Sequence, residues 1–220
     1  MIVLAIDTAG TGCFAAVYDS GSERVLGSAG AEIGKGHAEQ LMAFVDEALA
    51  ASGKMLSDLD RIAVTIGPGS FTGIRVGVAA ARGFALALGI PAVGVSTLAA
   101  IARSAGNQHA GRSVLAAMDA KRDELYWQIF DADGKPRADA TVVLRGDADM
   151  LLEGFDGVIC GSAAPLLTGV HSMPDHPDRA DIGVVARIGA TIDPGTGAPS
   201  PLYLRGPDVK SQAGFAVARA

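Results

Sequence analysis

The chain has 220 residues, which is enough for one large domain or two smaller ones. With 49% hydrophobic and 19% charged residues it has the composition of a folded protein, so a disordered or solvating chain is excluded. The formal net charge is −6, and acidic residues outnumber basic ones in both halves, which argues against independent capture of RNA or DNA.

Two apolar segments bear on localisation. The first, residues 1–6, contains no basic residue and ends at Asp7, unlike a signal peptide. The longest, residues 76–95, contains Arg82 and Pro91 and is rich in Gly and Ala, which argues against a membrane span. We therefore expect a cytoplasmic protein that does not attach to a membrane.

The first half predicts an antiparallel meander followed by alternating helices and strands. The apolar run 2–6 is typical of a strand buried on both faces, and turn residues at 19–22 join two further strands. From His37 onward, apolar residues such as Leu41 and Val45 recur at helical spacing. The expected elements are strands at 2–6, 13–18 and 25–26, a helix at 37–53, a strand at 61–66, a helix at 67–88, a strand at 92–95 and a helix capped by Ser96 or Thr97.

The second half begins with the same pattern as the first. Asp119 and Asp131 follow apolar runs as Asp7 and Asp19 do, and both pairs share one offset in the sequence. This predicts a duplicated α/β fold with two lobes, each a mixed sheet that starts with an antiparallel meander and is flanked by helices. The expected lobes are residues 1–108 and 109–220, and the strands expected in the second are 113–118, 125–130 and 157–160, the last running into a helix cap at Ser162.

The most informative segment is the run GPGSFTGIRVG at 67–77. A strand that leads through a Gly-rich turn into a helix presents free N–H groups and the positive end of the helix dipole, which suits a phosphate. The spacing is one residue longer than the dinucleotide fingerprint, and Ala87 stands where that fingerprint needs an acid. A tight turn that allows close helix packing explains the run equally well. Asp7 and Thr8 either organise a metal-bound water beside such a phosphate or form a turn.

Hydrolysis by a serine or a metal is weakly supported. Pro68 and Thr72 stand where a GxSxG motif around Ser70 needs glycine. None of the four histidines forms an HExxH motif. His37 precedes a helix, a place that more often holds a capping or surface residue than a catalyst.

Five blocks occur in an order typical of one known family: LAIDTA at 4–9, GPGSFTGIRVG at 67–77, GVSTL at 94–98, DAK with ELYW at 119–127, and PLYLR at 201–205. They resemble the TsaB family of bacterial tRNA threonylcarbamoyladenosine biosynthesis proteins, which are YeaZ-like and grouped with the glycoproteases. The resemblance implies the two-lobed fold of actin-like ATPases and sugar kinases (ASKHA). That fold agrees with the duplicated start of the two halves.

The resemblance implies a non-catalytic subunit rather than an enzyme. Proteins of this family pair with a catalytic paralogue, TsaD, which transfers a threonylcarbamoyl group to the N6 amine of adenosine in the anticodon loop of tRNAs that read ANN codons. A small ATPase, TsaE, assists. We therefore expect an activator and scaffold of TsaD that meets tRNA indirectly, through the complex. The monomer is expected to bind no cofactor tightly. Whether ATP or ADP binds in the assembled complex, and whether the isolated protein forms a homodimer, stays open.

Two positions distinguish this chain from the catalytic paralogue. That paralogue holds a metal through two histidines four residues apart, and the resemblance places Thr97 and Ile101 at those positions. Ile101 has no donor atom, so no metal site is expected. The TsaB pattern has Asp-Ala-Arg where this chain has Asp119-Ala-Lys121 followed by Arg122. Whether Lys121 or Arg122 replaces the arginine of the family stays open.

The resemblance also gives candidate sites. In this family the helices that begin near His37 and Ser70 supply the face that meets the paralogue, although the small residues at 73–89 also suit packing within the lobe. Two alternatives remain, a stand-alone actin-like or sugar-kinase-like ATPase that uses Asp7 and the Gly67 loop, and a glycoprotease-like peptidase. The expected partner-interface residues are His37, Leu41, Val45, Ser70, Phe71, Gly73, Ile74, Gly77, Ala80 and Ala81, and the expected phosphate or nucleotide loop consists of Asp7, Thr8, Gly67, Gly69, Ser70, Thr72, Gly73 and Arg75.

Overall fold

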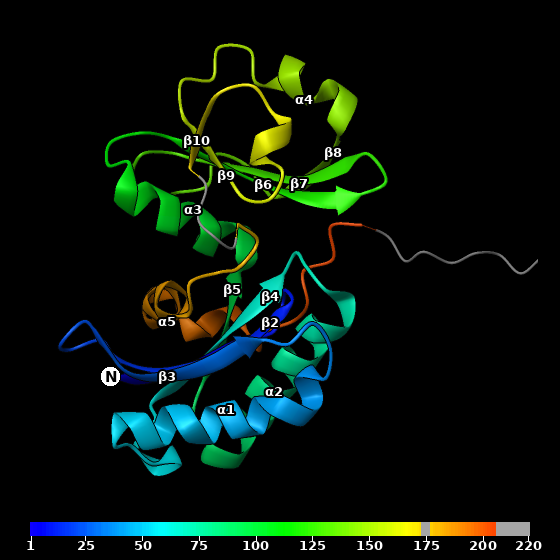
Figure 1. The fold of residues 1–220 in the computed structure, drawn as a ribbon. Helices are drawn as coiled ribbons and strands as arrows, with labels where there is room; N and C mark the ends of the chain where they lie inside the picture. Colours follow the sequence, from blue (N-terminus) through cyan, green and yellow to red (C-terminus); the bar gives the residue numbers. More distant parts are fainter. Residues whose placement is uncertain (173–176, 206–220) are drawn as a thin grey trace, which may run out of the picture.

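The computed structural model of the protein describes residues 1–172 and 177–205, and it contains two five-stranded mixed sheets (Figure 1). The strands are β1 (Ile2–Asp7), β2 (Gly12–Asp19), β3 (Arg24–Glu32), β4 (Arg61–Gly67), β5 (Ala92–Ser96), β6 (Val114–Lys121), β7 (Glu124–Phe130), β8 (Thr141–Leu144), β9 (Val158–Cys160) and β10 (Val170–Ser172). The first sheet has the order β3-β2-β1-β4-β5, and the second has the order β8-β7-β6-β9-β10.

The second sheet repeats the topology of the first. β6 pairs antiparallel with β7 and parallel with β9, as β1 pairs with β2 and β4. The outer strands follow the same rule, because β2–β3 and β7–β8 are antiparallel while β4–β5 and β9–β10 are parallel. The predicted α/β class and the antiparallel start of each sheet are therefore confirmed.

The helices form layers around and between the sheets. α1 (His37–Ser52) and α2 (Phe71–Leu88) cover one face of the first sheet, and α5 (Ile182–Thr191) covers the other. α3 (Thr97–Gln108) and α4 (Arg145–Leu151) pack on the second sheet. In Figure 1, α3 and α5 lie between the two sheets, and they contact each other.

The two inner helices cross between the halves of the chain. α3 precedes residue 109 but packs mainly on the second sheet, whereas α5 follows it and packs on the first. A division at residue 108 thus separates the strands of the two sheets but not their helices. The predicted second lobe, 109–220, also includes residues 173–176 and 206–220, which lie outside the described residues.

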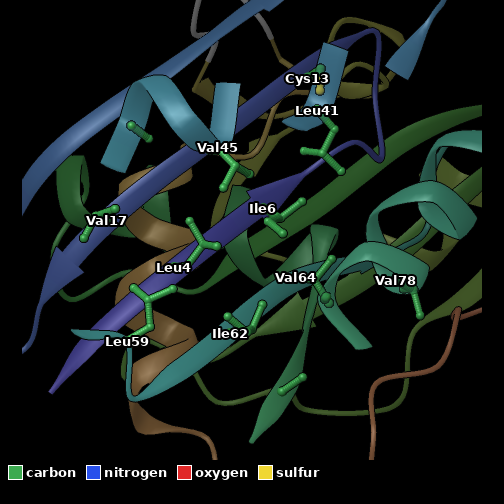
Figure 2. Close-up of a cluster of buried hydrophobic side chains, with 14 of the residues drawn as sticks. Leu4, Ile6, Cys13, Val17, Leu41, Val45, Leu59, Ile62, Val64 and Val78 are labelled. Atoms are coloured by element: carbon green, nitrogen blue, oxygen red, sulfur yellow. The ribbon is translucent and has the colours of Figure 1, made fainter. Parts of the chain in front are cut away.

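The main core of the first lobe fills the layer between the first sheet and α1 and α2 (Figure 2). Leu4 and Ile6 of β1 point into this layer, while Val3 and Ala5 point to the opposite face and meet α5. This alternation buries β1 on both faces, as its apolar run predicts. Full burial of a Leu or Ile side chain contributes roughly 1.5–3 kcal/mol, so β1 is a main anchor of the lobe.

Two elements of the first lobe differ in extent from the prediction. The third strand, β3, is much longer than its two strongest apolar residues indicate. The helix expected from Gly67 begins at Phe71, because Gly67 and Gly69 have φ angles of 108° and 157°, which no α-helix contains. Ser70 is the N-cap of α2, and its hydroxyl accepts a hydrogen bond from the N–H of Gly73 at 3.2 Å.

Ser162 does not cap a helix, contrary to the prediction. After β9 the chain forms a short 3₁₀ turn, Ala164–Leu166, which has no side-chain cap. The Ser162 hydroxyl instead accepts a hydrogen bond from the N–H of Asp119 at 2.9 Å. Its partner is therefore the neighbouring strand β6, a contact that local sequence cannot reveal.

Candidate functional site: the cleft between the lobes and the outer side of α2

A cleft of about 500 Å³ lies between the two lobes. The turn after β1 and the segment before α2 form one wall, and the ends of β6 and β7 form the other. Residues 177–179, which precede α5, also contribute. The charged residues that line the cleft are Asp7, Glu32, Asp119, Lys121, Asp178 and Arg179.

Asp7 stands at the end of β1 and is buried. Its Oδ1 accepts hydrogen bonds from the Thr65 hydroxyl at 2.6 Å and from the N–H of Ala9 at 3.0 Å. Burial raises the pKa of Asp7 above its usual value, and the hydrogen bonds from Thr65 and Ala9 oppose this rise. Asp7 therefore fixes the turn after β1, which is one of its two expected roles. Its other expected role, beside a metal-bound water, stays a prediction.

Asp119 is the counterpart of Asp7 in the second lobe, but its environment differs. Its Oδ2 lies 2.7 Å from Nζ of Lys121, and its Oδ1 accepts a hydrogen bond from the N–H of Lys121 at 2.7 Å. These bonds hold the pKa of Asp119 below its usual value. Lys121, Arg122 and Asp123 all have positive φ, between 59° and 64°, in the β6–β7 hairpin. Of the two neighbouring bases, Lys121 is the one that lines the cleft.

Asp178 and Arg179 connect the cleft to both lobes. Oδ1 of Asp178 accepts a hydrogen bond from the N–H of Ser162 at 3.0 Å, and burial raises the pKa of this carboxyl. Nη1 of Arg179 lies 3.6 Å from Oε1 of Glu32 in the first lobe, and its guanidinium carbon lies 5.1 Å from the ring centroid of Phe14. Neither residue was predicted from the sequence, because neither belongs to a recognisable motif.

Acidic groups outnumber basic groups in the cleft lining. Each base has an acidic neighbour, Lys121 with Asp119 and Arg179 with Glu32. A polyphosphate that enters the cleft would therefore meet four carboxyl groups and two basic groups that already have acidic neighbours.

Three of the eight residues expected to form a phosphate loop line the cleft, and five do not. Asp7, Gly69 and Ser70 line the cleft. The hydroxyl of Thr8 instead donates a hydrogen bond to the carbonyl oxygen of Gly73 at 2.7 Å, within the lobe. A phosphate site made of all eight stays a prediction. The five that do not line the cleft are Thr8, Gly67 and Gly73, which are buried, and Thr72 and Arg75, which are exposed.

Most residues expected at a partner interface lie in the core of the first lobe. A Cβ atom on Gly73 would overlap the carbonyl oxygen of Thr8, and one on Gly77 would overlap its hydroxyl oxygen, so these glycines allow α2 to pack closely. A partner would meet the outer sides of α1 and α2, and docking at these helices stays a prediction. Of the ten expected residues, Ser70 and Phe71 are exposed, Ala80 is partly buried, and His37, Leu41, Val45, Gly73, Ile74, Gly77 and Ala81 are buried.

Within residues 1–172 and 177–205, no group of three or more His, Cys, Asp or Glu side chains is placed to hold a metal. Thr97 and Ile101, at the start of α3, are buried. Ser70 caps α2, and Nε2 of His37 lies 3.2 Å from the carbonyl oxygen of Gly10, so both have local structural partners.

Among the described residues, α2 is the only helix whose length and composition would allow it to cross a membrane. Ile74, Val78 and Ala81 on one side of α2 pack into the core of the first lobe. The other side is exposed and carries Arg75 and Arg82. α2 is therefore a core helix with a second, outward side that remains available.

The segment Pro201–Arg205 joins the two lobes. The N–H of Leu202 donates a hydrogen bond to the carbonyl oxygen of Ile66 at 2.8 Å, and Arg205 forms an ion pair with Glu124. The sequence of this segment belongs to the family pattern but predicts no contact for it. The only sequence feature that pointed to these contacts is the presence of an aromatic and a basic residue, Tyr203 and Arg205.

Comparisons with known proteins place the chain in a family. Residues 27–143 match the family TsaD: tRNA N6-adenosine threonylcarbamoyltransferase. The chain is 38% identical to the tRNA threonylcarbamoyladenosine biosynthesis protein TsaB of Escherichia coli over 134 residues, which are 60% of this chain and 56% of that protein. This match thus spans little more than half of the E. coli protein. The chain is also 36% identical to the uncharacterized protein Rv3421c of Mycobacterium tuberculosis, over 94% of this chain and 93% of that protein.

Solved structures agree with this assignment. YeaZ from Pseudomonas aeruginosa is 28% identical with a TM-score of 0.75, covering 92% of this chain and 99% of that chain. The inorganic polyphosphate/ATP-glucomannokinase from Arthrobacter sp. strain KM, 15% identical with a TM-score of 0.54 over 86% of this chain and 98% of that chain, shares the fold. The predicted fold of actin-like ATPases and sugar kinases is therefore confirmed. The chain belongs to the TsaD family and, within it, to the TsaB/YeaZ-like proteins.

Proposed function

We propose that this protein is a non-catalytic subunit for the transfer of a threonylcarbamoyl group to the N6 amine of adenosine in tRNA, and that it activates and scaffolds TsaD. Membership of the TsaB/YeaZ-like proteins supports a role in forming this modification. The observation that carries the scaffold role is the outer side of α2, where Phe71 is 55% exposed and Leu86 is 86% exposed. This side of α2 therefore offers a partner two exposed large apolar side chains, one near each end of the helix.

The start of α3 supports the non-catalytic part of the proposal. The resemblance places Thr97 and Ile101 at the metal-binding positions of the catalytic paralogue, and both side chains are buried. Isoleucine has no donor atom for a metal, so in this proposal TsaD supplies the metal and the catalytic groups. TsaE joins the complex as its ATPase, and tRNA meets this chain through the complex.

The acidic lining of the cleft supports weak nucleotide binding by the isolated chain. A polyphosphate would meet the carboxyl groups of Asp119 and Asp178 there, and Lys121 already pairs with Asp119. ATP or ADP would therefore enter with the assembled complex. In this proposal the protein acts in the cytoplasm and can form a homodimer in isolation.

Reconstitution tests the proposal. The purified chain, TsaD and TsaE from one organism are combined with tRNA, ATP and threonylcarbamoyl-adenylate, and modified adenosine is measured by mass spectrometry after digestion. We expect substantial product only when the chain and TsaD are both present. Product formed by the chain alone would contradict the proposal. Tight Mg-ATP binding by the chain alone in calorimetry would instead favour a stand-alone ATPase.

A further inference from the structure

The outer side of α2 carries a regular stripe of exposed residues. Phe71, Arg75, Ala79, Arg82 and Leu86 follow one another at spacings of three or four residues, which places them on one side of the helix, and all five are exposed. We call these five residues the α2 stripe. It has an apolar side chain at each end, two arginines between them and a small residue at its centre.

Arg75 is held in position by two aromatic rings. Its guanidinium carbon lies 3.7 Å from the ring centroid of Phe71 and 5.7 Å from that of Tyr203, and the two rings lie 5.4 Å apart. Its Nε donates a hydrogen bond to the Tyr203 hydroxyl at 2.7 Å. Within residues 1–172 and 177–205, its two Nη atoms have no hydrogen-bond partner. A guanidinium fixed in this way can bind a carboxylate with little further loss of conformational entropy.

Tyr203 itself is anchored on both sides. The neighbouring Leu202 donates its backbone hydrogen bond to Ile66 at the end of β4. Two residues later, Nη2 of Arg205 donates to the carbonyl oxygen of Ala120 at 3.1 Å. The aromatic partner of Arg75 is therefore a fixed part of the fold and not a loose terminal residue.

The middle of the α2 stripe allows close approach of another backbone. Ala79 is exposed, and a Cβ atom on the adjacent Gly83 would meet nothing within 4 Å. Small residues at the centre of a helix surface let a second helix approach. The larger side chains at Phe71 and Leu86 would then flank the contact.

The positive charge of the α2 stripe is complementary to a helix that carries carboxylates. α2 contains Arg75 and Arg82 but no acidic residue, in a chain whose net charge is −6. Arg82 follows Arg75 by seven positions, which is about 10.5 Å along a helix axis. The complementary surface is an amphipathic helix with two carboxylates about two turns apart.

We propose that the α2 stripe binds an acidic amphipathic helix of the partner protein, with Arg75 and Arg82 each binding a carboxylate and Tyr203 acting as a positioning residue for Arg75. This inference rests on the proposed function, because it takes TsaD as the protein that supplies the helix. It adds the chemistry by which the docking surface recognises its partner.

Affinity measurements with charge-reversal variants test the inference. We expect Arg75→Glu and Arg82→Glu each to weaken binding to TsaD about tenfold or more, because Arg side chains often dominate interface affinity. Arg187→Glu is the matched control: it makes the same charge change on α5, on the opposite face of the first sheet, and should leave affinity unchanged. Added salt should weaken the binding of the wild type to TsaD more than it weakens the binding of the two α2 variants. Equal affinities for the wild type and both α2 variants would overturn the inference.

Tyr203→Phe tests the positioning role separately. This variant keeps the ring but removes the hydroxyl that accepts from Arg75, so the NMR signal of Arg75 Nε–H should broaden or shift while the melting temperature stays the same. Affinity for TsaD should fall less than in Arg75→Glu. An unchanged Nε–H signal with an unchanged affinity would exclude the positioning role.

The outcomes separate this inference from the proposed function. If wild-type protein neither binds nor activates TsaD, the proposed function fails. If the wild type activates TsaD and the α2 variants match the control, only the inference fails. The exposed Glu39 and Asp46 of α1 are also seven residues apart, so a second copy of this chain could offer the acidic helix. If Arg75→Glu and Arg82→Glu abolish self-association but leave the affinity for TsaD unchanged, the inference is overturned, and a second copy of this chain is the molecule that binds the α2 stripe.

Discussion

Thr8 and Gly77 approach so closely that a Cβ atom on Gly77 would overlap the hydroxyl oxygen of Thr8. That same hydroxyl donates a hydrogen bond to the carbonyl oxygen of Gly73, one turn earlier in α2, at 2.7 Å. The turn after β1, which forms one wall of the cleft, is thus held directly against α2. The inner side of α2 positions the cleft wall, and its outer side remains available to a partner.

Substitution of two α2 glycines should separate these two sides. Gly77→Leu should lower the free energy of unfolding by about 1–3 kcal/mol through overpacking against Thr8. For a protein of this size, each kcal/mol lowers the melting temperature by about 2–4 °C. Gly83→Leu, on the outer side of the same helix, should leave the melting temperature unchanged or raise it, because glycine is a poor helix former. Thermal melts of both variants check this, and equal losses at the two positions would contradict it.

Arg205 should stabilise the β6–β7 hairpin. Its Nη2 donates to the carbonyl oxygens of Ala120 and Lys121 at 3.1 and 3.3 Å and pairs with Glu124. Arg205→Ala should lower the free energy of unfolding by about 1.5–3 kcal/mol, the range for hydrogen bonds to charged groups. Hydrogen exchange at residues 120–124 should accelerate, because the left-handed backbone there loses its support. Exchange at the wild-type rate would show that the hairpin holds its shape alone.

Arg61 should fix the C-terminal end of α5 against the first sheet. Its Nη1 donates to the carbonyl oxygens of Gly189, Ala190 and Ile192 at 2.8, 3.1 and 2.7 Å. Arg61→Met keeps most of the side-chain volume but removes the donor and leaves these carbonyls without it, so the free energy of unfolding should fall by about 2 kcal/mol. Denaturant unfolding measures this change. An unchanged midpoint would exclude a stabilising role for this contact.

Asp7 should make stability depend on pH. Because burial raises its pKa in the folded state, its contribution is most favourable below the unfolded-state pKa and is lost as pH rises through the folded-state pKa. Asp7→Asn keeps an acceptor for Thr65 and the N–H of Ala9 but cannot ionise. The stability of Asp7→Asn relative to the wild type should therefore rise with pH and then level off. Chemical denaturation between pH 3 and 8 checks this, and a relative stability that falls with pH would contradict it.

The antiparallel start of each sheet and most helices could be predicted because they depend on local patterns. The apolar run of β1, the helical spacing after His37 and the repeated acids at Asp7 and Asp119 each report on nearby sequence, and the duplicated sheets follow from them. The exchange of α3 and α5 between the halves could not be predicted, because it depends on which sheet each helix meets after the chain has collapsed.

The site was predicted less completely than the fold. The glycine run could indicate a phosphate loop, a partner interface or close packing, and only the position of Thr8 shows that Gly73 and Gly77 are used for packing. The contact between Arg75 and Tyr203 joins residues far apart in the sequence, so no spacing rule reveals it.

The rate of threonylcarbamoyl transfer at a fixed TsaD concentration tests the central claim most directly. The initial rate is measured with TsaE, ATP, tRNA and threonylcarbamoyl-adenylate present, while this chain is added in increasing amounts. If the chain activates TsaD by docking through α2, the rate should rise from near zero and saturate, and Arg75→Glu should require more protein to reach the same rate. A rate that does not depend on the amount of chain added, or equal product when TsaD is omitted, would contradict the account.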